Sequence, residues 1–226
     1  MGLFGGTFNP IHLGHLRGAE EIRESFGLTE VVFIPASIPP HKKMKGMMDA
    51  SHRLEMTRRA ISTNPYFSVS DIELKRAGKS YSIDTIRYFK SIHPGSLYFI
   101  LGEDAFLEIE TWREFQSLFS LCHFIVMARP ESEEKGCFPE LPAGLAPFFK
   151  EDRSGETWTH TSGNYLYLKE ITLFDISSTK VRELINREAS IRYLIPTEVE
   201  IYIQERGLYR RDGRMKSGPQ ALLCHS

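Results

Sequence analysis

Two histidines, His12 and His15, follow a glycine-rich turn near the start of this 226-residue sequence. A short apolar run, Leu3 and Phe4, precedes the turn, and an amphipathic segment over residues 16–26 follows it. A strand, a glycine-rich loop and a helix start in this order present free backbone N–H groups to a phosphate, and glycine lets the backbone come close to a ligand. The two imidazoles would add donors at the same point. Taken alone, the stretch is also compatible with a tight turn that carries two surface histidines.

A second candidate phosphate site lies near the other end of the sequence, in residues 174–182 (FDISSTKVR). Ser177 or Ser178 is a typical N-cap residue for the helical pattern that follows, which leaves hydroxyls and unpaired N–H groups at a helix N-terminus. Lys180 and Arg182 add positive charge beside it. By itself this is an ordinary capped surface helix. Two helix starts suited to anions, one in each half of an α/β sequence, make a stronger case for an anionic ligand.

The segments GGTFNPIHLGH (residues 5–15) and ISSTKVR (residues 176–182) together resemble the nucleotidyltransferase superfamily. The marks of that superfamily are a His/Thr-x-Gly-His motif and a C-terminal Ser-Ser/Thr-x-x-Arg motif. Within it, the sequence is similar to the bacterial nicotinate-nucleotide adenylyltransferases. The resemblance runs from Met1 to about Tyr209, and residues 131–158 do not match closely.

The resemblance implies transfer of the adenylyl group of ATP to nicotinate mononucleotide, with release of pyrophosphate, as a step of NAD biosynthesis. The attacking phosphate oxygen is ionised at neutral pH, so that no general base is needed. His12 and His15 are then the predicted catalytic residues, and His15 is the stronger candidate for contact with the transition state. The motif match assigns ATP contacts to Gly5, Thr7, Phe8, Gly102, Asp104, Ser177, Ser178, Thr179 and Arg182. Mg²⁺ is the expected cofactor, held mainly by the triphosphate and not by a cluster of protein carboxylates.

The predicted contacts with nicotinate mononucleotide come from separate parts of the chain. They are His41, Lys42, Ser82, Thr85, Trp112 and Arg129. In the resembled family the loop with His41 and Lys42 approaches the phosphate, although its spacing alone fits a solvated loop equally well. Ser82 is the expected N-cap of a helix whose first N–H groups suit a carboxylate, and Thr85 has either this role or a capping role. Trp112 either stacks on the pyridinium ring or fills the core.

The composition limits the class of protein. A hydrophobic content of 41% and a charged content of 25% are typical of globular domains. A net charge of −1 argues against a nucleic-acid or membrane partner, so an anionic ligand needs a local cluster of positive groups. Cys122, Cys137 and Cys224 are odd in number and lack metal-like spacing, which favours a reducing compartment. The sequence carries no signal peptide pattern, and we therefore predict a cytoplasmic protein whose oligomeric state is left open.

The periodicity predicts an α/β fold, a Rossmann-like, doubly wound parallel sheet in a single domain with a small C-terminal helical part. Strands are expected at residues 2–5, 31–35, 67–74, 97–102, 123–127 and 165–174. Helices are expected at residues 17–26, 49–62, 82–93, 106–121, 177–187 and 197–206. The domain is predicted over residues 1–209, with 131–163 as an insertion or lid-like segment without a core element and 210–226 as a disordered tail. Arg53 lies in the first turn of a predicted helix, where a cation opposes the helix dipole, which indicates another reason for its presence.

Three other functions fit parts of the pattern. An adenylyltransferase for nicotinamide mononucleotide or phosphopantetheine would share the motif, but the phosphopantetheine enzymes usually carry Thr where His12 stands, on a shorter chain. A nucleotide-binding regulator without catalysis predicts a damaged histidine pair, and both histidines are present here. A fragment related to the class I tRNA synthetases would share His-x-Gly-His, but this chain lacks their length and basic character. Nicotinate mononucleotide is therefore the predicted acceptor.

Overall fold

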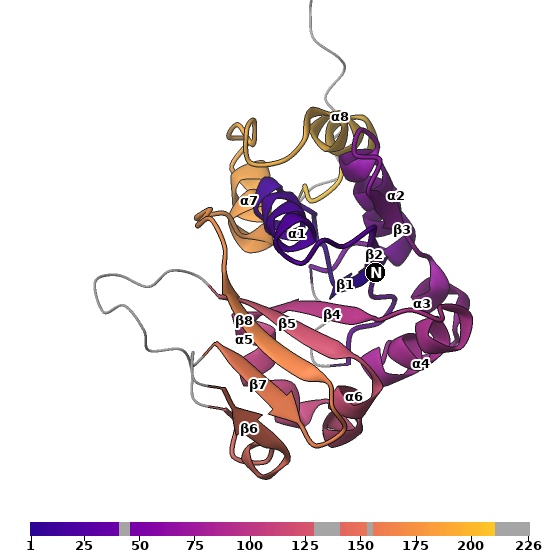
Figure 1. The fold of residues 1–226 in the computed structure, drawn as a ribbon. Coiled ribbons are helices and arrows are strands. Elements are labelled where there is room, and N and C mark those ends of the chain that lie inside the picture. The colour runs from indigo at the N-terminus through magenta and orange to yellow at the C-terminus, as the bar shows by residue number, and fades with distance from the viewer. Residues whose placement is uncertain (41–45, 129–140, 153–155, 211–226) are drawn as a thin grey trace, which may run out of the picture.

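The computed structural model describes residues 1–40, 46–128, 141–152 and 156–210. These residues form an α/β domain around an eight-stranded sheet with the order β3-β2-β1-β4-β5-β8-β7-β6 (Figure 1). The strands are β1 (Gly2–Gly6), β2 (Val31–Pro35), β3 (Phe67–Val69), β4 (Tyr98–Gly102), β5 (His123–Ala128), β6 (Phe149–Glu151), β7 (Thr157–His160) and β8 (Tyr165–Glu170). From β3 to β8, neighbouring strands in this order are parallel. β7 is antiparallel to β8, and β6 is antiparallel to β7. The predicted doubly wound parallel sheet is confirmed.

The chain begins in the middle of the sheet. β1 pairs with β2 on one side and with β4 on the other, so that Leu3 lies between Val32 and Phe99. The chain moves outward from β1 to β3 and then returns to β4 on the opposite side of β1. At such a switch of direction, the loops after the two central strands diverge and leave a crevice at the carboxyl ends of the strands.

Helices cover both faces of the sheet (Figure 1). They are α1 (Leu13–Ser25), α2 (Ala50–Ile61), α3 (Ile72–Lys75), α4 (Ser82–Ile92), α5 (Glu103–Leu107), α6 (Phe115–Leu121), α7 (Ser178–Asn186) and α8 (Thr197–Arg206). One core joins α1, α2, α7 and α8 to Phe4 and Phe33, and the other joins α4, α5 and α6 to Leu3 and Phe99. Neighbouring residues of β1 thus point into opposite cores, as the strand period of two requires.

Four predicted elements are wrong in extent. The helix expected over 17–26 begins four residues earlier, as α1 (Leu13–Ser25). The strand expected over 67–74 ends at Val69 and gives way to α3, because the Ile72 N–H donates to the Ser70 hydroxyl and turns the chain. The helix expected over 106–121 is divided into α5, a 3₁₀ turn (Ile109–Thr111) and α6. The break before α6 falls at Glu114, which has a left-handed backbone (φ 53°). The strand expected to reach Phe174 ends at Glu170.

The segment expected to lack a core element contributes to the sheet. β7 pairs with β8 as an antiparallel hairpin, and β6 adds an outer strand. Leu145 and Trp158 are buried in the core that holds α4 and α6. This part of the prediction for 131–163 is wrong, because short antiparallel strands in a proline-rich stretch give little local signal. Residues 129–140 and 153–155 lie outside the described residues, as does the predicted tail from residue 211 onward.

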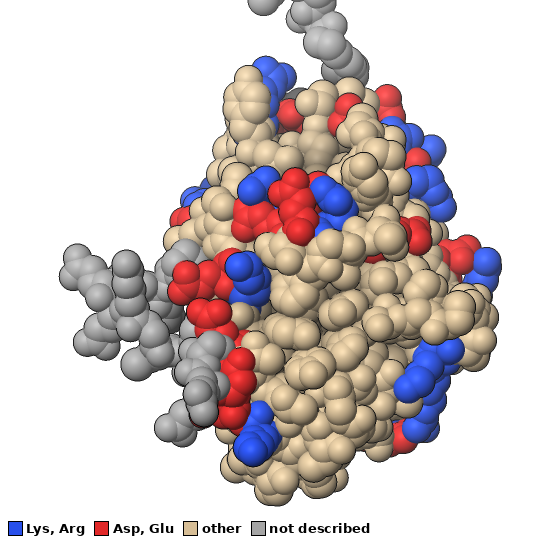
Figure 2. Space-filling model, in the orientation of Figure 1, with Lys and Arg blue, Asp and Glu red and all other residues tan. Residues whose placement is uncertain are grey.

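The surface carries both signs of charge. On the face shown in Figure 2, blue and red side chains are interspersed around a broad uncharged area, and the described residues of this face form no extended basic patch. Among the described helices, none has the length and apolar content that a bilayer crossing requires.

Candidate functional site

Two adjoining cavities open at the carboxyl ends of β1 and β4. The histidine cavity, of about 570 Å³, is lined by the β1–α1 loop, the start of α1, α5, residues 171–174 and the start of α7. The α4 cavity, of about 340 Å³, is lined by loop residues after β2, the start of α4 and Trp112. Both are lined by the shared wall, which consists of Gly5, Gly6, Thr7, Gly102 and Ala105. Ligands in the two cavities would therefore meet at the ends of the central strands.

The two predicted catalytic histidines stand together in the histidine cavity. His12 is the N-cap residue of α1, and His15 lies one turn into the helix. Their rings stack with centroids 3.6 Å apart. The backbone N–H of His12 donates to Nδ1 of His15 at 3.2 Å. Because Nδ1 of His15 acts as an acceptor, the proton of the neutral ring lies on Nε2, which makes that nitrogen a donor.

Phe8 packs against the His15 ring and is almost fully buried. It is 2% exposed, and its ring meets the His15 ring edge-on at 5.2 Å. Gly6 makes room for this ring, since a Cβ on Gly6 would lie 2.6 Å from the Phe8 ring. The structure therefore gives Phe8 a packing role under the histidine pair, and leaves little of its side chain for the nucleotide contact predicted from the motif.

The start of α7 closes the other side of the histidine cavity. Ser177 caps the helix by accepting the Lys180 N–H at 3.1 Å, and the Ser178 hydroxyl donates to the Pro10 carbonyl at 2.8 Å. Arg182 donates to the Asn9 carbonyl at 2.7 Å. These contacts join the two sequence motifs, and they place the first N–H groups of α7, which have no partner within the helix, beside the cavity.

Further contacts complete the histidine cavity. Thr179 accepts a hydrogen bond from the second terminal nitrogen of Arg182 at 3.1 Å. Gly102 ends β4, and a Cβ built there would meet nothing within 4 Å. Protein packing therefore does not require glycine at this position, and its absent side chain leaves open space in both cavities. Asp104 follows in α5 and lines the histidine cavity only.

The α4 cavity brings Ser82, Thr85 and Trp112 together, as the sequence predicts. The N-cap residue of α4 is Tyr81 and not Ser82, and no side chain caps the helix. The first N–H groups of α4 are therefore not occupied by a cap. Trp112 is half-buried, with its ring edge-on to Phe99 at 6.2 Å. Trp112 thus combines core packing with a surface in the cavity.

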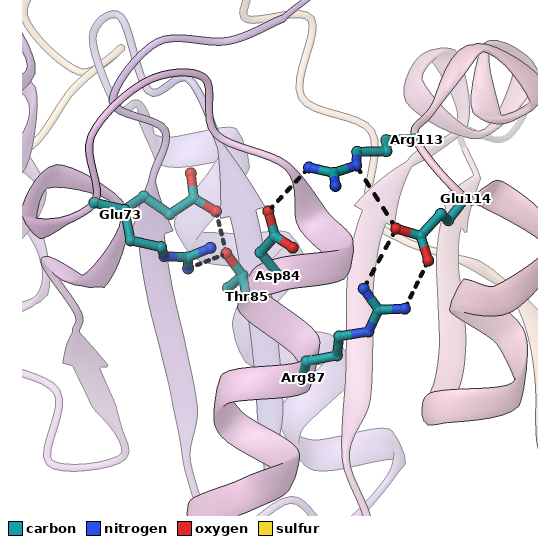
Figure 3. A network of polar contacts seen from close by, with 7 residues as sticks. Glu73, Asp84, Thr85, Arg87, Arg113 and Glu114 are labelled. Atoms are coloured by element: carbon teal, nitrogen blue, oxygen red, sulfur yellow. Dashed lines mark hydrogen bonds and ion pairs between the residues drawn. The ribbon is translucent and has the colours of Figure 1, made fainter.

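Thr85 belongs to an internal polar network (Figure 3). Its hydroxyl donates to the carboxylate of Glu73 at 2.6 Å and accepts from Arg76 at 2.7 Å. Burial raises the pKa of Glu73, while the hydrogen bond from Thr85 lowers it in part. The single hydroxyl proton of Thr85 is thus committed within the protein. A ligand in the α4 cavity would meet the helix N–H groups and not this hydroxyl as a donor.

Charged side chains border the same network. Figure 3 shows Arg113 beside Asp84 and Glu114, at 3.6 Å from each, while Arg87 pairs with Glu114 at 2.6 Å. Arg113 also lies 5.0 Å from the ring centre of Tyr81 and lines the α4 cavity. The cavity therefore has a half-exposed cation at its border.

The structure extends the list of candidate residues and leaves part of it outside the described chain. Among the predicted residues, His41, Lys42 and Arg129 lie outside the described residues. Sequence reasoning missed Glu73, Arg113 and residues 171–174 as cavity residues. Leu173 and Phe174 are exposed in the structure, but in the sequence they extend an apolar strand pattern, which suggested that the strand continues.

Over the described residues there is no group of three or more His, Cys, Asp or Glu side chains that could hold an ion. Glu103 and Asp104 are the acidic residues that line the histidine cavity.

The sequence matches the cytidylyltransferase-like family over residues 3–184. A protein of Citrifermentans bemidjiense named "Probable nicotinate-nucleotide adenylyltransferase" is 47% identical over 92% of this chain and 97% of its own. A relative from Geotalea daltonii with the same name is 44% identical over 95% of this chain and 99% of its own. These relatives are matched over almost their whole length.

Solved structures show the same fold. The nicotinic acid mononucleotide adenylyltransferase of Plasmodium falciparum, complexed with NaAD, has a TM-score of 0.68 and 22% identity, with 92% of this chain and 96% of that chain covered. The same enzyme complexed with APC has a TM-score of 0.66 and 21% identity over the same shares of the two chains.

Proposed function

The chain belongs to the cytidylyltransferase-like family and, within it, to the nicotinate-nucleotide adenylyltransferases, and on this premise we propose its reaction and the role of each cavity. The enzyme transfers the adenylyl group of ATP to nicotinate mononucleotide and releases pyrophosphate, which forms the deamido dinucleotide in NAD biosynthesis. ATP occupies the histidine cavity and the mononucleotide occupies the α4 cavity. One observation carries this assignment: the two cavities share the wall formed by Gly5, Gly6, Thr7, Gly102 and Ala105.

The reaction requires alignment more than proton transfer. A phosphate oxygen of the mononucleotide attacks the α-phosphorus, and the bond to the bridging oxygen breaks as pyrophosphate leaves with the electron pair. The nucleophile is already ionised, so that the protein needs to hold two anions in line and to stabilise the charge that develops. Nε2–H of His15 supplies a donor for that purpose.

The β- and γ-phosphates are assigned to the start of α7. Ser177, Ser178 and Thr179 supply backbone N–H groups, and Arg182 supplies a cation that is already fixed by the Asn9 carbonyl. An arginine with one nitrogen anchored in the protein loses less side-chain entropy when it binds a phosphate. Mg²⁺ bound with ATP would neutralise charge on the triphosphate, and Glu103 and Asp104, which line the histidine cavity, are the carboxylates that could contribute to holding it.

The acid group of the mononucleotide is assigned to the N-terminus of α4. The N–H groups of Ser82 and Ile83 favour a carboxylate over an amide, because the helix dipole rewards a negative charge. Trp112 offers a face for the positively charged pyridinium ring, a contact worth about 0.5–2 kcal/mol. We expect the acid to be preferred over the amide by at least about tenfold, which corresponds to about 1.4 kcal/mol.

Product analysis tests the proposed function. The enzyme is supplied with MgATP and, in turn, with nicotinate mononucleotide, nicotinamide mononucleotide and phosphopantetheine, and the adenylylated products are separated and identified. The deamido dinucleotide is expected as the main product. Equal use of acid and amide would refute the selectivity, and product from phosphopantetheine alone would refute the acceptor.

The variant Trp112→Ala tests the assignment of the α4 cavity. Its KM for the mononucleotide should rise while its KM for ATP stays unchanged. Tyr88→Ala is the control, because Tyr88 lines neither cavity.

The reaction is proposed to take place in the cytoplasm. Cys122 is a free, buried thiol, and burial raises its pKa to about 12, so that it stays protonated at neutral pH. This agrees with cysteine usage that indicates a reducing compartment. Fractionation of the native organism's cells, followed by assay for the deamido dinucleotide, tests the location.

A further inference from the structure

Arg53 is a buried cation whose hydrogen bonds all go to backbone carbonyls. It lies in the first turn of α2 and is 1% exposed. Nε donates to the Met48 carbonyl at 2.8 Å, one terminal nitrogen donates to Thr7 at 2.8 Å, and the other donates to Ser37 at 2.9 Å. No ion pair of Arg53 is found among the described residues, and burial lowers the pKa of its guanidinium. A buried charge without a carboxylate is costly for stability, which suggests a role other than stability.

The three carbonyls belong to segments that line the two cavities, although Arg53 lines neither. Thr7 is part of the shared wall. Met48 follows Gly46 and Met47, which line the histidine cavity. Ser37 lies in the loop after β2, whose neighbouring residues 36, 39 and 40 line the α4 cavity. One planar guanidinium therefore sets the distance between the wall and a loop on each side of it.

The connection continues from Ser37 to the entrance of α4. The Ser37 N–H donates to the hydroxyl of Ser80 at 2.8 Å, and the Ser80 N–H donates to the Ile38 carbonyl at 3.0 Å. Ser80 lines the α4 cavity beside Glu73, and its hydroxyl is a hydrogen-bond donor that lowers the pKa of the Glu73 carboxyl. The backbone of Ser37 thus joins Arg53 to Ser80, because its carbonyl accepts from Arg53 and its N–H donates to Ser80.

We propose that Arg53 is a positioning residue for adenylyl transfer, which acts through Ser37 and Ser80 to hold the two cavities in register. The inference rests on the proposed function, because it assumes that substrates in both cavities react at the shared wall. A displacement of about 1 Å between two bound reactants is enough to cost up to about a hundredfold in rate. The flat fork of arginine places its donors on three separate nitrogens, one for each carbonyl, whereas lysine carries all of its donors on one nitrogen and cannot reach three separated carbonyls in this way.

Arg53→Lys provides the test. It keeps the charge and removes the fork, and we expect kcat with saturating substrates to fall by about tenfold or more at a temperature at which circular dichroism shows the variant to be folded. Arg59→Lys is the matched control, since Arg59 lies on the same helix, bonds to Glu55 at its surface and lines neither cavity. In the control, kcat should stay within about twofold of the wild type. A lower melting temperature of Arg53→Lys with unchanged kcat would show a purely structural role and overturn the proposal.

A second variant covers the case in which Arg53→Lys does not fold. Ser80→Ala removes the hydroxyl that receives the Ser37 N–H, and should lower kcat by itself, while Ser80→Thr, which keeps the hydroxyl, should restore it. Where Arg53→Lys folds, the double variant with Ser80→Ala should be about as slow as the slower single variant, because both interrupt one connection. Effects that multiply, or an unchanged kcat in Ser80→Ala, would overturn the proposal. The assays use whichever mononucleotide the wild type accepts, so that a wild type inactive with every acceptor refutes the proposed function instead.

Discussion

His15 has one ring nitrogen engaged inside the protein. Nδ1 accepts the His12 N–H, and the Phe8 ring supports the imidazole from below. A donor held in this way needs little reorganisation when charge develops on the α-phosphate, which is the condition under which a single hydrogen bond has a large effect on rate. The stacked His12 ring limits rotation of His15 further.

We therefore expect His15→Ala to lower kcat by roughly two to four decades, the range for the loss of one preorganised donor. Steady-state kinetics with MgATP and nicotinate mononucleotide measure the effect, and circular dichroism checks the fold. His93→Ala is the control, because His93 ends α4 and lines neither cavity. Turnover of His15→Ala close to that of the control would remove His15 from the mechanism.

The variant Arg182→Ala tests the role of the second motif, residues 176–182. Replacement by Ala would remove the proposed charge-assisted contact with the phosphates, and the KM for ATP should rise by about ten- to a hundredfold. Lys180→Ala supplies the control, since Lys180 lies in the same helix but pairs with the exposed Asp175 at 3.3 Å. ATP titrations at saturating mononucleotide measure both variants. If the two ATP titrations coincide, Arg182 serves only to join α7 to Asn9.

The role of a single residue could be predicted from the sequence where that role depends on its neighbours along the chain. Glycine before a helix start and a serine N-cap are signals within a few positions, and the structure brings these residues to one cavity. Arg53 and Glu73 have their partners elsewhere: Arg53 bonds across 46 positions to Thr7, and Glu73 across 12 positions to Thr85. The unfavourable place of Arg53 in its helix was visible in the sequence, but its three acceptors required the fold.

Among the elements, the β7–β8 hairpin contains a buried histidine, His160, whose titration makes the free energy of unfolding depend on pH. His160 is 7% exposed, and its Nδ1 accepts the Ser162 N–H at 3.1 Å. Burial lowers the pKa of His160, and also that of His123 in β5. Because the folded pKa lies below the unfolded one, the unfolded chain binds more protons in the window between them. The free energy of unfolding should therefore fall as the pH decreases through about 6.5 toward the folded pKa values.

The variant His160→Gln should flatten this part of the pH profile. Gln does not titrate, and its amide oxygen can still accept a hydrogen bond, so that the slope due to His160 disappears while that of His123 remains. Urea unfolding at several pH values between about 5 and 7.5 measures the slope. His93→Gln lies outside the sheet and serves as control. A slope unchanged in His160→Gln would show that the ring of His160 titrates alike in both states.

Elements were predictable where burial on both faces leaves a continuous apolar run. Val31–Pro35 and Tyr98–Gly102 are such strands, and both lie next to β1 in the sheet. The helix expected over 106–121 failed because Glu114 adopts a left-handed backbone, with its carboxylate held by Arg87 of α4. That contact is tertiary, and it permits the turn that carries Trp112 to the α4 cavity. β6 and β7 were not predicted for a similar reason, since they are stabilised by tertiary pairing, β7 with β8 and β6 with β7.

At the scale of the whole molecule, Asn9 connects distant parts of the chain. Its side-chain oxygen accepts the Met48 N–H at 3.1 Å and the Tyr209 hydroxyl at 2.9 Å. Its carbonyl accepts from Arg182. Burial raises the pKa of Tyr209, so that the phenol stays protonated as a donor at neutral pH. The segment after α8 is therefore attached to the same loop that carries the histidine pair.

This attachment predicts where the chain can be shortened. A chain that ends at Arg211 keeps Tyr209 and should retain full activity, since nothing in the sequence after it shows a core pattern. A chain that ends at Leu208 loses the phenol, leaves Asn9 with one donor fewer and should lose activity about tenfold or more through displacement of the histidine loop. Tyr209→Phe in the full chain separates the hydrogen bond from the packing of the ring, and should reproduce part of the loss. Kinetics and thermal unfolding of the three proteins measure these effects. An inactive or insoluble chain ending at Arg211 would show that the last residues dock on the domain, whereas equal activity of both truncated chains would remove Tyr209 from the support of the site.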